Sequence, residues 1–298
     1  MHIQNTTLDP ATLYRYASAA PTLSYADALT TDALNRYEQA GFLAVADVLL
    51  PEEIASARAA LDDLIHGRVH AYTDLQPETD VRDKWESANT AERAALVRKV
   101  WRFVEFEPRL NALATAQTRI QNVLEHLLGE PCQLIQDMAL LKPPFIGTEK
   151  PWHQDAAYFG WGPPEKIIGV WIALDPATAE NGCMHALPGT HREGATPHIH
   201  RRDCQIADER VQVERDVLVP LQPGGAMFFS SLLHHGTPPN KSGQQRWALQ
   251  FHYAAKSATP MSRRTHADLF FEDDPEAALP LYRGCRGQNG ELVSMIEP

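Results

Sequence analysis

The sequence predicts a mainly β fold with a helical N-terminal half, in which helices flank a double-stranded β-helix (jelly roll) core. After Pro131, short apolar or alternating runs are divided by Gly, Pro and Asn, which is typical of an antiparallel sandwich or jelly roll. Before Pro131, apolar residues recur mainly at helical spacing. We expect one domain over residues 1–298, with helical support at about 28–130, the jelly-roll core at about 131–256 and a loop-rich tail at 257–298.

The first helix and strand have clear end signals. Thr31-Asp32 can cap a helix that runs to Ala40, and Gly41 then ends it. Phe42–Val45 reads as a strand, and a second helix opens at Pro51, since proline suits the first helical position.

The rest of the N-terminal half is less regular. Residues 1 to about 28 are read as an arm, and the polar stretch 67–90 as a long loop or lid, with a disordered insertion as an equal alternative. From 90 to 128 the pattern predicts two or three helices, interrupted near Pro108 and ended by residues 129–131.

The C-terminal half is expected to supply the strands. The predicted runs are Cys132–Leu141, Ile167–Leu174, Val211–Leu221, Ala226–Ser231 and Arg246–Ala254. In the tail, Asp273-Asp274-Pro275 reads as a turn.

Composition limits the function. The chain of 298 residues has a formal net charge of −11, whereas a protein that binds the phosphate backbone needs a basic face. No apolar run approaches the length of a membrane span, and no secretory signal is visible. We therefore expect no nucleic-acid or membrane partner and a cytoplasmic location. The cysteines, which show no close pairing and are expected to be reduced, are Cys132, Cys183, Cys204 and Cys285.

His153 and Asp155 form the first candidate for chemistry. On a strand, side chains two residues apart point to the same face, so an imidazole and a carboxylate would converge as two metal ligands. Ferrous iron in oxygenases is typically held by two His and one carboxylate, with positions left open. A polar turn or a satisfied surface pair remains the alternative.

A third ligand could come from His234 or His235, which cannot both face one centre on a strand. Arg246 follows after the turn 239–243, and a hairpin would place it near the metal. A buried guanidinium needs an anion, either a bound carboxylate or a structural Asp or Glu. Lys142, at the end of an apolar strand, could reach an anionic ligand or extend to solvent.

In their order, these motifs resemble the phytanoyl-CoA dioxygenase family of Fe(II)/2-oxoglutarate oxygenases, and most of all its phytanoyl-CoA dioxygenase domain-containing proteins. The resemblance covers about residues 134–254 and is carried by Lys142-Pro143-Pro144, His153-Gln154-Asp155, Trp171-Ile172-Ala173-Leu174, Glu180-Asn181-Gly182, Leu187-Pro188-Gly189-Thr190-His191, His235-Gly236-Thr237, Asn240 and Arg246.

The resemblance implies a residue for each part of the site. It implies His153, Asp155 and His235 as iron ligands; His235 is preferred to His234 because it precedes Gly and lies eleven residues before Arg246. It implies that Arg246 pairs with the far carboxylate of 2-oxoglutarate. The further co-substrate contacts that it implies are Lys142, Trp171 and Thr237.

The implied reaction uses Fe(II), 2-oxoglutarate and O2, releases succinate and CO2, and hydroxylates an aliphatic carbon of a small-molecule substrate. Halogenating relatives have a small residue where this chain has Asp155, so hydroxylation is favoured. Two rival functions are a zinc or manganese hydrolase or isomerase on the same barrel, and a catalytically silent binding module. The sequence does not indicate the substrate or the oligomeric state.

Overall fold

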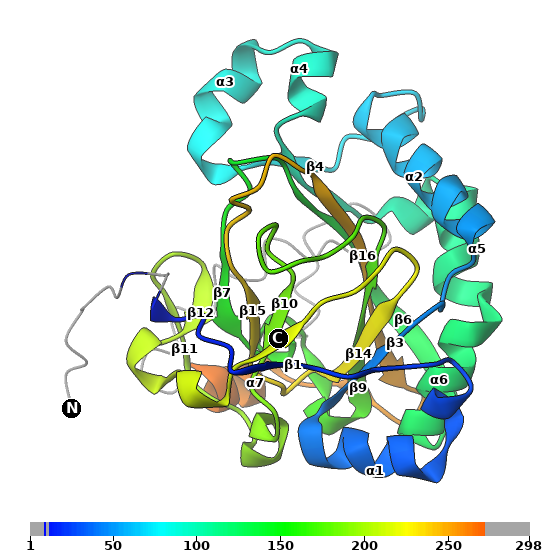
Figure 1. Ribbon diagram of the computed structural model, residues 1–298, viewed down its shortest axis with the longest axis vertical. Coiled ribbons are helices and arrows are strands. Elements are labelled where there is room, and N and C mark those ends of the chain that lie inside the picture. The colour runs from blue at the N-terminus through cyan, green and yellow to red at the C-terminus, as the bar shows by residue number, and fades with distance from the viewer. Residues whose placement is uncertain (1–8, 10–11, 272–298) are drawn as a thin grey trace.

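The computed structural model describes Asp9 and residues 12–271. Its largest element is an eight-stranded sheet that faces a five-stranded sheet, with helices covering the outer side of the larger sheet (Figure 1). The larger sheet has the order β2 (Thr22–Leu23), β3 (Phe42–Val45), β14 (Ala226–Ser230), β9 (Ile167–Ala173), β16 (Arg246–Ala255), β6 (Cys132–Lys142), β5 (Val97–Trp101) and β4 (Leu75–Pro77).

The smaller sheet carries the short strands. Its order is β1 (Ser18–Ala19), β13 (Val217–Val219), β10 (Met184–Ala186), β15 (His235–Thr237) and β7 (Lys150–His153). Two further pairs are β11 (His198–His200) with β12 (Cys204–Ile206), and β8 (Trp161–Gly162) with β17 (Thr259–Pro260).

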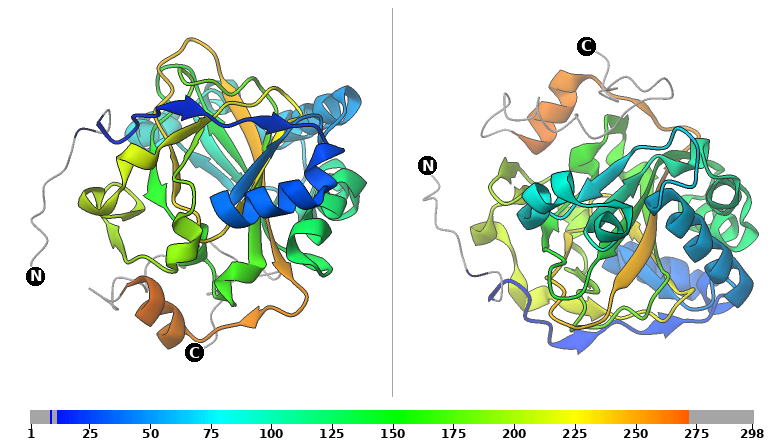
Figure 2. Two further views of the ribbon diagram at one scale, coloured as in Figure 1. Left: turned by 60° about the horizontal axis from the view of Figure 1, so that its bottom comes forward. Right: turned by 90° about the horizontal axis from the view of Figure 1, so that it is seen from above.

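The helices pack mainly against one side of the larger sheet, as the two turned views also show (Figure 2). The helices are α1 (Thr31–Ala40), α2 (Pro51–Ile65), α3 (Arg82–Ser87), α4 (Thr90–Ala94), α5 (Pro108–Ala116), α6 (Thr118–Leu128) and α7 (Arg263–Phe270), of which α7 packs elsewhere, against Ala156 and Leu232. Leu61 of α2, Leu110 of α5 and Val123 of α6 are fully buried in one cluster with Val170 and Phe251 of the sheet. This apolar layer holds the central strands rigid from outside, which leaves their other face free to build a site.

Several predicted boundaries are confirmed. Helix α1 ends at Gly41 as predicted, and the φ of 85° at Gly41 is left-handed. Its cap is Thr30, which accepts a hydrogen bond from Ala33 N, and not the expected Thr31-Asp32, which lie in the first turn of the helix. Strand β3 covers the predicted residues, and α2 begins at Pro51. Four of the five predicted C-terminal strands are present within two residues of their expected ends, while the run from Val211 yields only β13.

The prediction of a helical N-terminal half is wrong in part. Strand β5 lies inside the stretch 90–128 that was expected to be helical, and β4 lies in the expected loop 67–90 together with α3. The physical reason is pairing with β6, because Lys99 and Val100 are aligned with Leu140 and Ala139. The N-terminal half therefore contributes strands to both edges of the larger sheet.

Other expectations concern the ends of the chain. The arm includes the short strands β1 and β2, and the tail includes α7, while the expected turn at residues 273–275 lies outside the described residues. Cys132, Cys183 and Cys204 are free thiols. Among the helices of residues 12–271, none is long and apolar enough to cross a membrane.

Asp137 of β6 gives a testable pH effect on stability. Burial raises the pKa of its carboxyl from 3.8 to about 6, although Val104 N donates a hydrogen bond to it. Because the folded state binds this proton more tightly, the contribution of Asp137 to stability is fully present below pH 3.8 and is lost as the pH rises through about 6. An amide in its place still accepts the hydrogen bond but does not titrate.

We therefore expect Asp137→Asn to gain stability over the wild type as the pH rises through this window, by about 2–3 kcal/mol. Urea denaturation of both proteins at a series of pH values measures the difference in free energy of unfolding. A difference that stays constant with pH would contradict the expectation.

Candidate active site

A cavity of about 840 Å³ lies between the two sheets. Its wall combines the inner face of β5, β6 and β16 with β7 and β15 of the smaller sheet. The polar residues of the wall include Lys99, Lys142, His153, Asp155, His235, Thr237, Arg246, Gln250 and His252.

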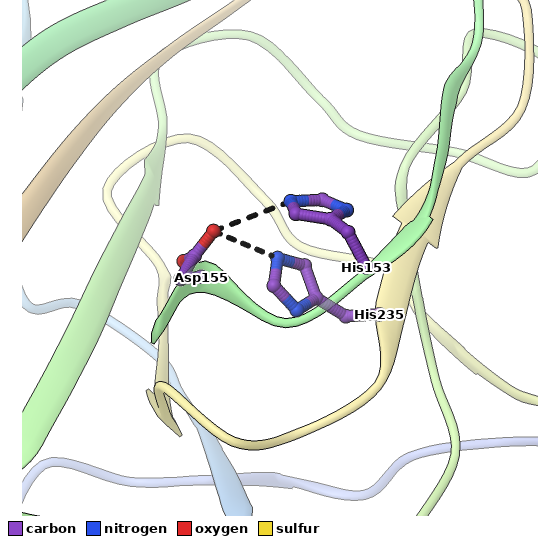
Figure 3. A group of neighbouring side chains, drawn as sticks. All are labelled: His153, Asp155 and His235. Atoms are coloured by element: carbon purple, nitrogen blue, oxygen red, sulfur yellow. Dashed lines mark ion pairs between the residues drawn. The ribbon is translucent and has the colours of Figure 1, made fainter. Parts of the chain in front are cut away.

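Three side chains in this cavity form a compact cluster, shown in Figure 3. Oδ1 of Asp155 lies 3.2 Å from Nε2 of His153 and 3.5 Å from Nε2 of His235. One ligand atom from each residue lies within 4.8 Å of the others, and all three residues are buried. The spacing and the donor types match the two-His, one-carboxylate set that holds iron.

The two sheet strands bring the histidines together directly. Strands β7 and β15 are antiparallel neighbours, and His153 is aligned with His235. The prediction that a barrel brings these distant segments side by side is confirmed. Asp155 does not continue β7 as expected, because that strand ends at His153 and Asp155 begins the 3₁₀ helix η5 (Asp155–Tyr158).

The turn into η5 is fixed by Gln154. Its side chain is fully buried, donates to the carbonyls of Gly194 and Leu232, and accepts from Thr196 N. Since these bonds occupy the amide, Gln154 holds the chain between the two cluster residues rather than facing the cavity.

Hydrogen bonds set the orientation of both imidazoles. Nδ1 of His153 lies 2.7 Å from Pro151 O, and Nδ1 of His235 lies 2.9 Å from Leu233 O. A carbonyl only accepts, so each Nδ1 carries the proton and each Nε2 presents a lone pair to Asp155. Three electron-rich atoms thus converge, and a cation between them would satisfy all three.

The electrostatic environment keeps the cluster in the forms that bind a metal. Burial, together with His235 and Lys150, lowers the pKa of His153 to about 3, so its imidazole is neutral at pH 7. Burial raises the pKa of Asp155, but the polar contacts of its carboxylate, among them the one with His252 Nε2, outweigh burial and hold that pKa well below its ordinary value. A neutral imidazole and an ionised carboxylate are the states that ligate.

His234 lies apart from the cluster. Its side chain is buried, and its Nε2 lies 3.0 Å from the hydroxyl of Thr196. Among the described residues, the group that could hold a metal includes His235 and not His234. As expected from the alternation of side chains along a strand, His234 and His235 point in different directions, and only His235 belongs to the cluster.

Arg246 is a buried cationic side chain of the cavity wall. Its side chain is 2% exposed, and its guanidinium lies over the ring of Trp171 at 5.1 Å. Nε and Nη1 are buried without a hydrogen-bond partner, and no acidic side chain of residues 12–271 forms an ion pair with it. Burial lowers its pKa to about 10, which leaves it charged at neutral pH.

The expected hairpin between the His235 strand and the Arg246 strand is wrong. Strand β15 belongs to the smaller sheet and β16 to the larger one, so the turn between them crosses from sheet to sheet. Asn240 fixes this crossing, since its amide donates to the carbonyls of Lys142, Pro143 and Gln244. Arg246 thus reaches the cavity from the wall opposite the histidines.

The other expected co-substrate residues have different surroundings. Lys142 shares a face of β6 with Met138 and lines the cavity, and it is aligned with Arg246 across the sheet. Its ammonium donates to the carbonyls of Thr148 and Pro238, and burial beside Arg246 lowers its pKa well below the ordinary value. Thr237 lines the cavity, while Trp171 lies beneath Arg246 with its Nε1 unpartnered.

Three polar residues of the cavity wall, Lys99, Gln250 and His252, are not among those expected from the sequence. Gln250 and His252 follow Arg246 at even spacing on β16, so the alternation of that strand would have placed them on the same face. Lys99 carries no such signal, because the sequence pattern around it predicts a helix and not the strand β5. It is partly buried over the ring of Trp101, and burial beside Lys150 lowers its pKa to about 7.

The chain is similar in sequence to known proteins. The model of the family described as phytanoyl-CoA dioxygenase (PhyH) matches residues 37–248. Phytanoyl-CoA dioxygenase domain-containing protein 1 of Danio rerio is 25% identical over 272 residues, covering 79% of this chain and 94% of its own. A methylphosphonate hydroxylase of Gimesia maris is 29% identical over 244 residues, covering 80% and 86%.

A solved structure shares the fold. EvdO2 from Micromonospora carbonacea var. aurantiaca, crystallised with 2-oxoglutarate, has a TM-score of 0.60 at 24% identity and covers 78% of this chain and 93% of that chain. The family match spans most of the sequence, including every residue of the buried cluster and Arg246. The chain therefore belongs to the phytanoyl-CoA dioxygenase family, within the class of Fe(II)- and 2-oxoglutarate-dependent oxygenases.

Proposed function

We propose that this protein, as a single oxygenase domain, hydroxylates an aliphatic carbon of a small-molecule substrate. In this proposal His153, Asp155 and His235 hold the iron, and Arg246 binds the far carboxylate of 2-oxoglutarate. The observation that carries the proposal is the unpartnered guanidinium of Arg246 in the same cavity as the three converging ligand atoms. A buried cation of this kind is costly unless an anion meets it.

The residues present fit both groups. The three ligand atoms come from three residues, so a bound iron would keep open positions for a keto acid and oxygen. Arg246 offers a planar fork to a carboxylate, and Thr237 of β15 lines the same cavity from the other sheet. Bound iron would supply the activation of O2 coupled to the oxidative decarboxylation of 2-oxoglutarate.

The roles of the chain are to orient and to exclude water. His153 and His235 keep their Nε2 lone pairs directed inward through bonds from Nδ1 to backbone carbonyls. Trp171 fills the space beneath Arg246, so that the guanidinium would bind the far carboxylate of 2-oxoglutarate away from solvent. Lys99 offers a second cation to an acid in the cavity, and Lys142 helps to fix the wall beside Arg246.

Release of succinate tests the reaction. Purified protein with 2-oxoglutarate in air is expected to form succinate only when Fe(II) is added, and a substrate is expected to give a product one oxygen atom heavier by mass spectrometry. A hydrolase or isomerase would turn over with zinc or manganese and consume no 2-oxoglutarate. A silent binding module would fail to bind 2-oxoglutarate with Fe(II) under anaerobic conditions.

A further inference from the structure

The carboxylate of Asp155 uses its two oxygen atoms for different contacts. Oδ1 faces the imidazoles of His153 and His235, at 3.2 Å and 3.5 Å from their Nε2 atoms. Oδ2 lies instead 2.7 Å from Nε2 of His252 and 3.2 Å from Nε2 of Gln250. One oxygen therefore belongs to the cluster that would hold the metal, and the other belongs to a pair of side chains from β16.

Both members of this pair are held rigidly. Gln250 and His252 are 5% and 1% exposed, and they lie on a strand that is paired on both sides, with β6 and with β9. The ring of His252 packs against that of Phe159, with centroids 4.5 Å apart. The pair thus comes from the larger sheet and contacts the carboxylate across the cavity from the two histidines.

The hydrogen atoms of the pair can be assigned from their partners. A ring nitrogen 2.7 Å from an ionised carboxylate donates, which puts the proton of His252 on Nε2. The amide nitrogen of Gln250 also donates only. The 3.0 Å between Gln250 Nε2 and His252 Nε2 is then a contact between two donors that converge on one oxygen.

We propose that His252 and Gln250 are positioning residues that hold Oδ2 of Asp155, so that this carboxylate binds the metal through Oδ1 alone. The inference rests on the proposed function, because it takes the cluster to be the iron site. A carboxylate can bind a metal through one or both oxygens. Binding through both would occupy a position that the keto acid and oxygen need. The two donors keep that position open.

The test measures binding of Co(II), as a stable stand-in for Fe(II), by competition with a coloured chelator. His252→Phe and Gln250→Met remove one donor each at similar volume, and His252→Gln returns an N–H near the original Nε2. We expect His252→Phe to lose about 10–100-fold in metal affinity, since loss of a ligand's hydrogen-bond partner typically has this effect. Gln250→Met should lose less, and His252→Gln should recover part of the loss.

Visible absorption of bound Co(II) supplies a readout that a purely structural role would not change. The spectrum reports the coordination number, and His252→Phe is expected to shift toward the weaker absorption of a higher-coordinate site. The matched control is His185→Phe, which removes another buried imidazole that contacts a buried carboxylate, Asp216, at 2.9 Å. The control should lose thermal stability but keep the wild-type metal affinity and spectrum.

Each result has a distinct meaning. A folded His252→Phe protein with wild-type Co(II) affinity and spectrum would overturn the inference while leaving the metal site intact. If that variant does not fold, wild-type affinity and spectrum in Gln250→Met would overturn it. Absence of Co(II) binding by the wild-type protein would instead remove the metal site, and the inference with it.

Discussion

Replacing His235 with alanine is expected to abolish metal binding, whereas His234→Ala should leave it in place. His235 supplies one of the three converging ligand atoms, and two remaining ligands hold a divalent ion poorly. His234 contacts Thr196 and lies outside the cluster, so its loss affects packing alone. Metal analysis of the two purified variants after anaerobic loading with Fe(II) gives the answer.

The two variants are matched, because they remove neighbouring buried imidazoles from one chain segment. Circular dichroism and thermal denaturation show whether each variant is folded. Equal iron content in both folded variants would contradict the assignment of His235 as a ligand.

Replacing Arg246 with alanine is expected to raise the 2-oxoglutarate requirement by roughly two to four powers of ten. The carboxylate would be left buried without its partner, at a cost of about 3–5 kcal/mol, and each 1.4 kcal/mol corresponds to a factor of about ten. Folding should suffer little, because the guanidinium forms no ion pair within the described residues. Anaerobic titration of the metal-loaded protein with 2-oxoglutarate measures the change.

Arg246→Lys serves as the control for charge. It keeps the cation but loses the planar fork, so we expect an intermediate requirement. A requirement unchanged in Arg246→Ala, with the protein folded, would count against a role in binding the co-substrate.

The sequence predicted the parts of the fold that depend on local signals. Gly41 and Pro51 mark helix ends by their own backbone preferences, and these boundaries are found in the structure. Strand β5 could not be predicted in this way, because Val97–Trp101 is fixed as a strand by β6 and not by its own residues. This strand also places Lys99 in the cavity. Without the strand, the sequence gives no reason to expect Lys99 there.

The site was predictable where motif order carried the information. The motifs single out His153, Asp155 and His235, and these residues lie together in the cavity. The backbone elements that bring these three side chains together could not be predicted from the sequence. Asp155 reaches the cluster from a 3₁₀ turn, whose start depends on the bonds of Gln154 to a segment about forty residues away. Gln250 and His252 belong to no recognised motif. The alternation of β16 places them on the face of Arg246, but their contact with Asp155 is visible only in the structure.

The division of the site between two sheets has a mechanical consequence. The histidines sit on one sheet and Arg246 on the other. A diacid that binds the metal through one end and Arg246 through the other would link the two sheets. Metal and diacid together should then raise the melting temperature by more than the sum of their separate effects, because each prepares the anchor that the other uses. If calorimetry shows that the two shifts in melting temperature simply add, the bound diacid does not link the two sheets.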